Sequence, residues 1–226
     1  MMNIRRSISI LVAAAFLVFP VCRISATIVS GTVTGGKGLP PDSRFIKLTV
    51  PFRESKPENT VGRNNFQSPH LYGFDEGQNI DIPEDLKVDI LSDGRGGEQG
   101  RGVIPAGVTV ASHYIFFDPR RGARLQGSIH FDSYIIGIIT STNKLKQSDF
   151  LVNTSVNYQN PGNRGLEQRD SVRITGLYNI SIDWQASSPG DYIRVLTLFS
   201  PGAVTAPTPG TRPSTERRHP PHRMGL

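Results

Sequence analysis

Short runs in which apolar and polar residues alternate are the dominant pattern in the middle of this chain. Ile129 and Phe131 flank His130, and Ile180, Ile182 and Trp184 are separated by single polar residues. A period of two predicts strands with one buried face. The same alternation recurs at residues 46–50, 88–90, 108–110, 115–117, 172–174 and 193–199, with Gly, Pro, Asn or Asp between many of the runs.

One run is apolar almost throughout, from Tyr134 to Ile139. This run is typical of a strand buried on both faces, and Gly137 within it indicates a bulge or a close backbone approach. The runs together predict eight or nine strands at spacings that suit an all-β fold, a two-sheet antiparallel β-sandwich of the jelly-roll kind. We expect most of a core set to face the space between the sheets: Ile136, Ile138, Ile182, Trp184, Val195 and Phe199.

Residues 142–151 interrupt the strand pattern. Leu145, Phe150 and Leu151 follow a roughly helical spacing, and Ser141 or Thr142 can serve as the N-cap. Ser148 and Asp149 can cap a second single turn. The segment therefore predicts one short helical crossover between strands.

The N-terminal 26 residues have the three parts of a secretory signal peptide. A short basic segment precedes an apolar run at 7–21, and small residues end at Ala26. We expect cleavage before Thr27, although an uncleaved anchor is the alternative; the run is short for a bilayer span and Pro20 interrupts it. Cys22 is the chain's single cysteine, so the mature protein would have no disulfide and no thiol chemistry.

The other end, residues 201–226, contains six prolines and no aromatic residue. Such a composition predicts a disordered, basic tail after a single domain at 27–200. The net charge of +6 belongs to the two ends, because 18 basic and 18 acidic residues remain in 27–200. Nucleic-acid binding requires clustered basic residues on the folded part, and the basic excess lies in the two ends instead, so the charge distribution argues against a nucleic-acid partner.

Several acidic residues are candidates for chemistry, but none has diagnostic spacing. Asp75, Glu76, Asp118, Asp132 and Asp183 could supply a pair for glycoside hydrolysis. Asp81, Asp85 and Asp89 follow in four-residue steps rather than in a calcium-loop pattern. The interpretation as structural or solvated carboxylates is favoured over either site.

The histidines and the glycine-rich segment are likewise weak candidates. His70, His113 and His130 could complete a Ser-His-acid triad, but no Gly-x-Ser-x-Gly sequence is present. His113 lies in an apolar run that is typical of a buried structural histidine. The loop Gly94–Gly102 has no phosphate-binding motif. We therefore assign no catalytic, metal or cofactor-binding residue and expect no cofactor.

Aromatic side chains offer one further alternative. Trp184, Tyr114, Phe116 and Phe117 could form a platform on which a sugar ring stacks, as in a carbohydrate-binding module. Aromatic residues in alternating strands are more often core residues, and that is the interpretation favoured here.

Six short strings stand out along the chain, at 67–71 (QSPHL), 74–79 (FDEGQN), 112–119 (SHYIFFDP), 136–142 (IGIITST), 164–167 (RGLE) and 187–195 (SSPGDYIRV). They resemble a family of uncharacterised exported bacterial proteins, many of which end in a PEP-CTERM sorting signal. The resemblance covers roughly residues 60–198, and this sequence has no Pro-Glu-Pro signal with a membrane helix after it. The resemblance implies export and a bacterial envelope setting and transfers no catalytic residue.

The sequence thus predicts a secreted, non-enzymatic β-sandwich protein with a structural or adhesive role at the cell envelope or outside it. A carbohydrate-binding module, with or without calcium, is the alternative. An extracellular hydrolase is the least favoured of the three. The expected partners are extracellular polysaccharide or envelope components, with no nucleic acid and no membrane span after cleavage.

Overall fold

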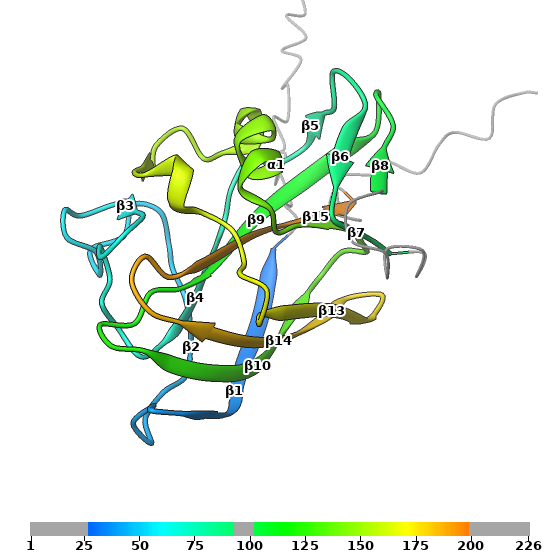
Figure 1. Ribbon diagram of the computed structural model, residues 1–226. Helices are drawn as coiled ribbons and strands as arrows, with labels where there is room; N and C mark the ends of the chain where they lie inside the picture. Colours follow the sequence, from blue (N-terminus) through cyan, green and yellow to red (C-terminus); the bar gives the residue numbers. More distant parts are fainter. Residues whose placement is uncertain (1–26, 93–101, 199–226) are drawn as a thin grey trace, which may run out of the picture.

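The computed structural model describes residues 27–92 and 102–198, in which β-strand is the main secondary structure, with 47% in strands and 7% helical (Figure 1). The predictions for 1–26, 201–226 and most of the Gly94–Gly102 loop concern residues outside these ranges. The strands are β1 (Ile28–Lys37), β2 (Phe45–Lys47), β3 (Thr60–Val61), β4 (Leu71–Asp75), β5 (Ile80–Asp81), β6 (Leu86–Val88), β7 (Ile90–Leu91), β8 (Gly102–Ile104), β9 (Thr109–Phe117), β10 (Ala123–Phe131), β11 (Ile135–Ile139), β12 (Asn157–Tyr158), β13 (Ser171–Gly176), β14 (Asn179–Ala186) and β15 (Asp191–Leu198).

Two main sheets confirm the predicted β-sandwich. One has the order β1-β10-β14-β13, and the other has the order β2-β4-β9-β15-β11-β7, with β5 also pairing with β9. Most pairs are antiparallel, but β2 runs parallel to β4, and β12 runs parallel to β3. Two small two-stranded sheets, β12-β3 and β6-β8, complete the described strands.

The four-stranded sheet has one buried face, as the alternation predicts. In β10, Leu125 and Ile129 are buried, whereas His130 lies half-buried on the opposite side. In β14, Ile180, Ile182 and Trp184 are buried, and the residues between them are not. A strand with period-two burial fits a sheet whose other face meets solvent.

The larger sheet is buried on both faces, which explains the nearly continuous burial of β9 and β15. Its outer face packs under the chain between β2 and β4 at one end, and under α1 and the β5–β8 segments at the other. The inner face meets the four-stranded sheet in a core of Ile28, Leu71, Ile115, Phe117, Ala123, Leu125, Ile129, Phe131, Ile135, Ile138, Val172, Ile180, Ile182, Trp184, Ala186, Ile193 and Val195.

Four of the six predicted core residues lie between the two sheets: Ile138, Ile182, Trp184 and Val195. Ile136 does not, because it packs partly buried against the cluster on the outer face. A register irregularity between Ile135 and Gly137 shifts the alternation there, and it confirms the predicted bulge. Phe199 lies outside the described residues.

The predicted helical crossover is present. It consists of α1 (Thr142–Gln147) and a 3₁₀ turn, η2 (Asp149–Leu151), with N-caps at Ser141 and Ser148. Leu145 and Leu151 anchor it in the outer-face cluster. A further 3₁₀ turn, η3 (Pro161–Asn163), lies in the chain that leads toward β13.

The two lateral edges of the sandwich differ. On one side, β1 and β2 lie in contact, and the ring of Phe45 packs so closely under Gly31 that a Cβ atom there would lie 2.5 Å from the ring. On the other side, β13 and β7 end their respective sheets.

In the part of the chain that the structure describes, no helix combines the length and apolarity needed to cross a bilayer.

Candidate functional site

One charged pair among the described residues is entirely buried. Glu76 follows β4 and Arg194 lies in β15; the arginine Nε is 2.6 Å from one carboxylate oxygen and an Nη is 3.0 Å from the other. Both side chains are 0% exposed. A bidentate geometry is the strongest form of this contact, and it compensates for the loss of solvent.

Further hydrogen bonds to Glu76 and from Arg194 extend this pair into a network. Ser112 and Tyr158 donate their hydroxyl protons to Glu76 at 2.6 Å and 2.7 Å. Arg194 donates to the carbonyl of Leu145, at the end of α1, at 3.1 Å. Burial, with the adjacent Glu76 carboxylate, raises the pKa of Tyr158. The network therefore ties α1 and the chain around β12 to the outer face of the sheet, and its central pair has no access to solvent.

Three residues form an acid–imidazole–hydroxyl chain with the order of a catalytic triad. His113 Nδ1 lies 2.8 Å from Asp75, and its Nε2 lies 3.1 Å from the Thr197 hydroxyl. Burial opposes ionisation of Asp75, but the bond and charge of His113, with help from Lys47, hold the pKa of this carboxyl well below its usual range. His113 and Thr197 are both 0% exposed, so no substrate carbonyl can reach the hydroxyl. His113 is thus a buried, hydrogen-bonded histidine, as its apolar run predicts.

The other predicted acidic residues have separate partners. Asp118 is buried and accepts from the Phe66 backbone at 3.0 Å. Asp183 pairs with Arg124 on the outer surface of the four-stranded sheet at 2.5 Å. Only Asp75 and Asp132 converge, and they do so on Thr27.

The three acidic residues at four-residue spacing, Asp81, Asp85 and Asp89, also have separate hydrogen-bond partners. Asp81 bonds to the Thr109 hydroxyl and Asp85 to the Ala106 backbone. Asp89 receives the backbone N–H groups of Thr140 and Ser141 at 2.7 and 2.9 Å, which stabilises the start of α1. Over 27–92 and 102–198, no group of three His, Cys, Asp or Glu side chains has a metal-binding arrangement.

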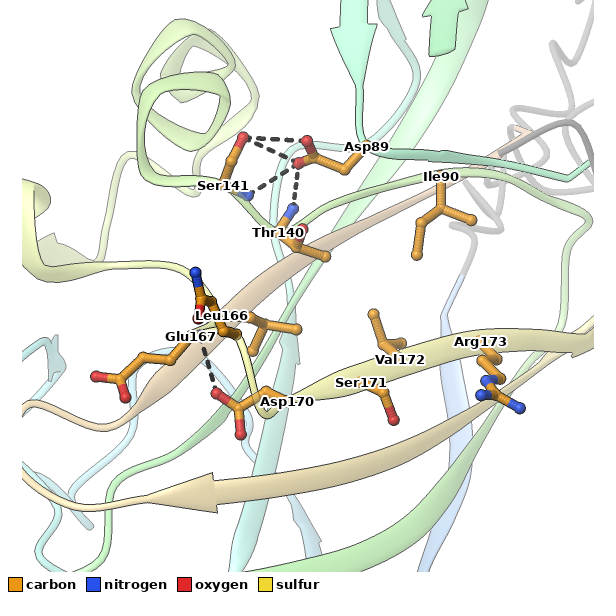
Figure 2. A pocket seen from close by; sticks show the side chains of 11 residues that line it. Asp89, Ile90, Thr140, Ser141, Leu166, Glu167, Asp170, Ser171, Val172 and Arg173 are labelled. Carbon is orange, nitrogen blue, oxygen red and sulfur yellow. Dashed lines mark hydrogen bonds between the residues drawn. The ribbon is translucent and has the colours of Figure 1, made fainter. Parts of the chain in front are cut away.

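A groove of about 480 Å³ opens at the edge of the sandwich where β13 and β7 end the two sheets. Figure 2 shows Ile90 and Val172 pointing toward each other across it, with Leu166 on its inner side. Asp89 lies at one rim and Asp170 at the other. The groove therefore lies where the core between the two sheets reaches the surface, and polar residues border it.

A carboxyl cluster that the sequence did not reveal borders this groove. Asp170 accepts backbone N–H bonds from Glu167 and Gln185 at 2.9 and 2.7 Å. Asp191, nearby in β15, is only 3% exposed, and one of its oxygens is buried with no hydrogen-bond partner. Burial and the neighbouring charges of Asp170 and Glu167 raise the pKa of Asp191 to about 8. Asp191 is therefore a proton-binding group at neutral pH.

The favoured interpretation of Trp184, Tyr114, Phe116 and Phe117 as core residues is confirmed, because all four are 0% exposed. The alternative, an exposed platform for a sugar ring, is wrong for these four side chains. A different set of side chains lies on the surface. Tyr134 and Tyr178 stack with ring centroids 4.9 Å apart and planes 18° from parallel.

Tyr134 is 45% exposed, and the adjacent Leu177 is 65% exposed. His130 meets the edge of Tyr178 at 6.1 Å, and its Nδ1 lies 2.9 Å from the side-chain oxygen of Asn179. We call Tyr134, Leu177, Tyr178 and His130 the tyrosine patch. It joins the turn between β13 and β14 to the loop after β10, and the backbone bond from Ile135 to Leu177 (2.9 Å) holds the two loops together.

The sequence contained one signal for this patch. Leu177 and Tyr178 directly follow Gly176 in a tight turn, where large apolar residues are unusual. Comparison of the chain with protein-family models, with curated proteins and with solved structures finds no match.

Proposed function

We propose that this protein is exported and acts outside the cytoplasm as a non-enzymatic β-sandwich protein with a structural or adhesive role. The observation that carries the proposal is the tyrosine patch, a preformed set of aromatic and apolar side chains on the surface. The signal-peptide pattern before Thr27 supports export.

The placement of the reactive side chains supports a role in contact rather than in catalysis. The Glu76–Arg194 pair and the His113–Thr197 contact lie in the interior, where they join elements distant in sequence. The tyrosine patch has the opposite character, because it exposes side chains that would gain free energy by leaving water. Tyrosine also loses little conformational entropy on binding, since it has only two side-chain torsions.

Carbohydrate binding is the second candidate, and the same patch favours it. A tyrosine ring offers an apolar face to the C–H groups of a sugar, while its hydroxyl remains free to bond with water or ligand. His130 and Asn179 add polar groups at the border. Extracellular polysaccharide or envelope material is the partner that fits this combination.

The test compares binding by variants of the patch. Tyr134→Ala and Tyr178→Ala should lower the amount of protein retained by isolated envelope material or polysaccharide at least tenfold, with an unchanged melting temperature. Phe150→Ala is the matched control, because Phe150 is another surface aromatic, 43% exposed, on η2. Its removal should leave retention unchanged.

A glycan array with and without calcium then separates the two candidates. Saturable binding to a defined glycan, lost in Tyr178→Ala, supports the carbohydrate-binding module. Retention by envelope material without any glycan signal supports the adhesive role. Equal retention of the wild type and both tyrosine variants would overturn the patch as the contact surface.

A further inference from the structure

Thr27, the first described residue, is held by side chains from three separate parts of the chain. Its backbone nitrogen donates to Asp132 Oδ1 at 2.7 Å, and its hydroxyl donates to Asp75 Oδ2 at 2.7 Å. Lys47 reaches the same hydroxyl and the carbonyl of Ile28, the latter at 2.7 Å. Ile28 itself donates its N–H to Asp75 at 3.0 Å.

These contacts fix the beginning of β1. Asp132 also donates its own N–H to the Thr27 carbonyl at 3.1 Å, so the two residues bond to each other twice. Ile28 is 1% exposed and enters the core between the sheets. Side chains from β2, β4 and the loop after β10 therefore hold Thr27 in place.

The two carboxylates near Thr27 differ in their partners. In the described part of the chain, Lys47 and His113 both pair with Asp75, at 2.9 Å and 2.8 Å, and neither pairs with Asp132. Asp132 instead accepts the N–H of Thr27 at 2.7 Å, so an α-ammonium at Thr27 would place a positive charge directly on this carboxylate. A charge-assisted bond of this length is about twice as strong as a neutral one.

We infer that Thr27 is the N-terminus of the exported chain and that its α-ammonium forms a structural ion pair with Asp132. The inference rests on the proposed export. Water, with a leader peptidase as catalyst, hydrolyses the Ala26–Thr27 peptide bond; Ala26 leaves with a carboxylate and Thr27 keeps the nitrogen, which takes up a proton. Removal of the leader thus turns the hydrogen bond from Thr27 to Asp132 into a charge-assisted one, and the processed protein is more stable than its precursor.

The test uses three purified chains that differ only at the start. The first begins at Thr27 with a free ammonium. The second carries one extra glycine before Thr27, which keeps the net charge but moves the ammonium one residue away, and the third is acetylated at Thr27. The first chain should melt about 2–4 °C above the other two, and the difference should shrink at high salt.

Asp132→Asn identifies the partner, because it removes the charge and keeps an oxygen acceptor. It should lower the melting temperature of the Thr27 chain and abolish most of its advantage over the glycine-extended chain. Asp42→Asn, at an exposed carboxylate outside the group, is the control and should preserve that advantage. Equal melting temperatures for all three chains, or an advantage that survives Asp132→Asn, would overturn the ion pair.

Intact-mass analysis of the full chain expressed in an exporting bacterium tests the position of the cut. A mass that corresponds to Thr27–Leu226 supports the inference. An exported protein that starts elsewhere overturns Thr27 as the terminus while export stands. Retention of Met1 inside the cell overturns the proposed export itself, and the purified chains still decide whether the Thr27 site binds an ammonium.

Discussion

Replacing Glu76 by glutamine should destabilise the protein far more than the loss of one hydrogen bond would. The change is nearly isosteric, but it leaves the Arg194 guanidinium, 0% exposed, with only the partly exposed Asp149 carboxylate, 3.4 Å away, as a counter-charge among the described residues. Removing one partner of a buried pair costs about 3–5 kcal/mol, against a total stability of about 5–15 kcal/mol for a domain. At about 2–4 °C per kcal/mol for a chain of this size, we expect the melting temperature to fall by about 6–20 °C.

A double-mutant cycle separates the charge from other effects of the substitution. Arg194→Met alone should also destabilise the protein, because it leaves the Glu76 carboxylate buried and unpaired. The double variant, which has neither charge of this pair, should be less destabilised than the sum of the two single variants. The assay is thermal and urea unfolding of all four proteins.

Two results would refute this reasoning. One is a loss below about 1 kcal/mol for Glu76→Gln, which would mean that water reaches the pair. The other is simple additivity in the cycle, which would mean that the two charges do not interact. Asp183→Asn is the matched control, since it breaks the exposed pair with Arg124, and we expect almost no change in melting temperature.

Two further predictions concern the core and the pH dependence. Trp184→Ala should lower the free energy of unfolding by roughly 3–5 kcal/mol, measured in urea, because the indole is fully buried between the sheets. Trp184→Phe should lower it less, since the indole N–H has no hydrogen-bond partner in the core that would be lost. Near-equal stability of Trp184→Ala and the wild type would contradict this prediction. Asp191 has a pKa near 8 in the folded protein against roughly 3.9 when unfolded, so its contribution to stability is complete below about pH 4 and is lost as the pH rises toward 8. Unfolding measured from pH 4 to 8 should therefore show a falling stability that Asp191→Asn flattens, and an unchanged slope in that variant would disprove the assignment.

The sequence predicted the elements whose burial follows a simple period. The alternation in β10 and β14 and the apolar run of β11 translate directly into one-sided and two-sided burial. The crossover helix was predictable from the local spacing of its apolar residues, although the side chain that holds its start, Asp89, is distant in sequence. Each of these elements is decided by residues within a short window.

The element that pattern reasoning missed most clearly is β1. Its sequence, IVSGTVTGGK, contains three glycines and few large apolar residues, so its own propensity for a strand is weak. It forms because β10 offers a long partner, with register from Ile28–Phe131 to Lys37–Arg124. Tertiary pairing decides its conformation.

The candidate sites were beyond the sequence because they join distant residues. Glu76 and Arg194 are separated by 118 positions, and His113 meets Thr197 across 84. The tyrosine patch likewise requires the loop after β10 to meet the turn after β13. The spacing of residues within a single sequence does not reveal such long-range contacts. The one local signal is that Leu177 and Tyr178, two large side chains, lie in a tight turn.

The edges of the two sheets have a consequence for how the protein behaves when it is concentrated. A long, regular edge strand is a template for fibre growth, since its free N–H and C=O groups can pair with another copy. Here β1 breaks its register twice and ends in Lys37, and β13 breaks its register after Ile174. In the larger sheet, the edge strands β2 and β7 are three and two residues long. At high concentration, copies of the protein thus offer one another little straight backbone for pairing, and the strand lengths and bulges themselves oppose fibre formation.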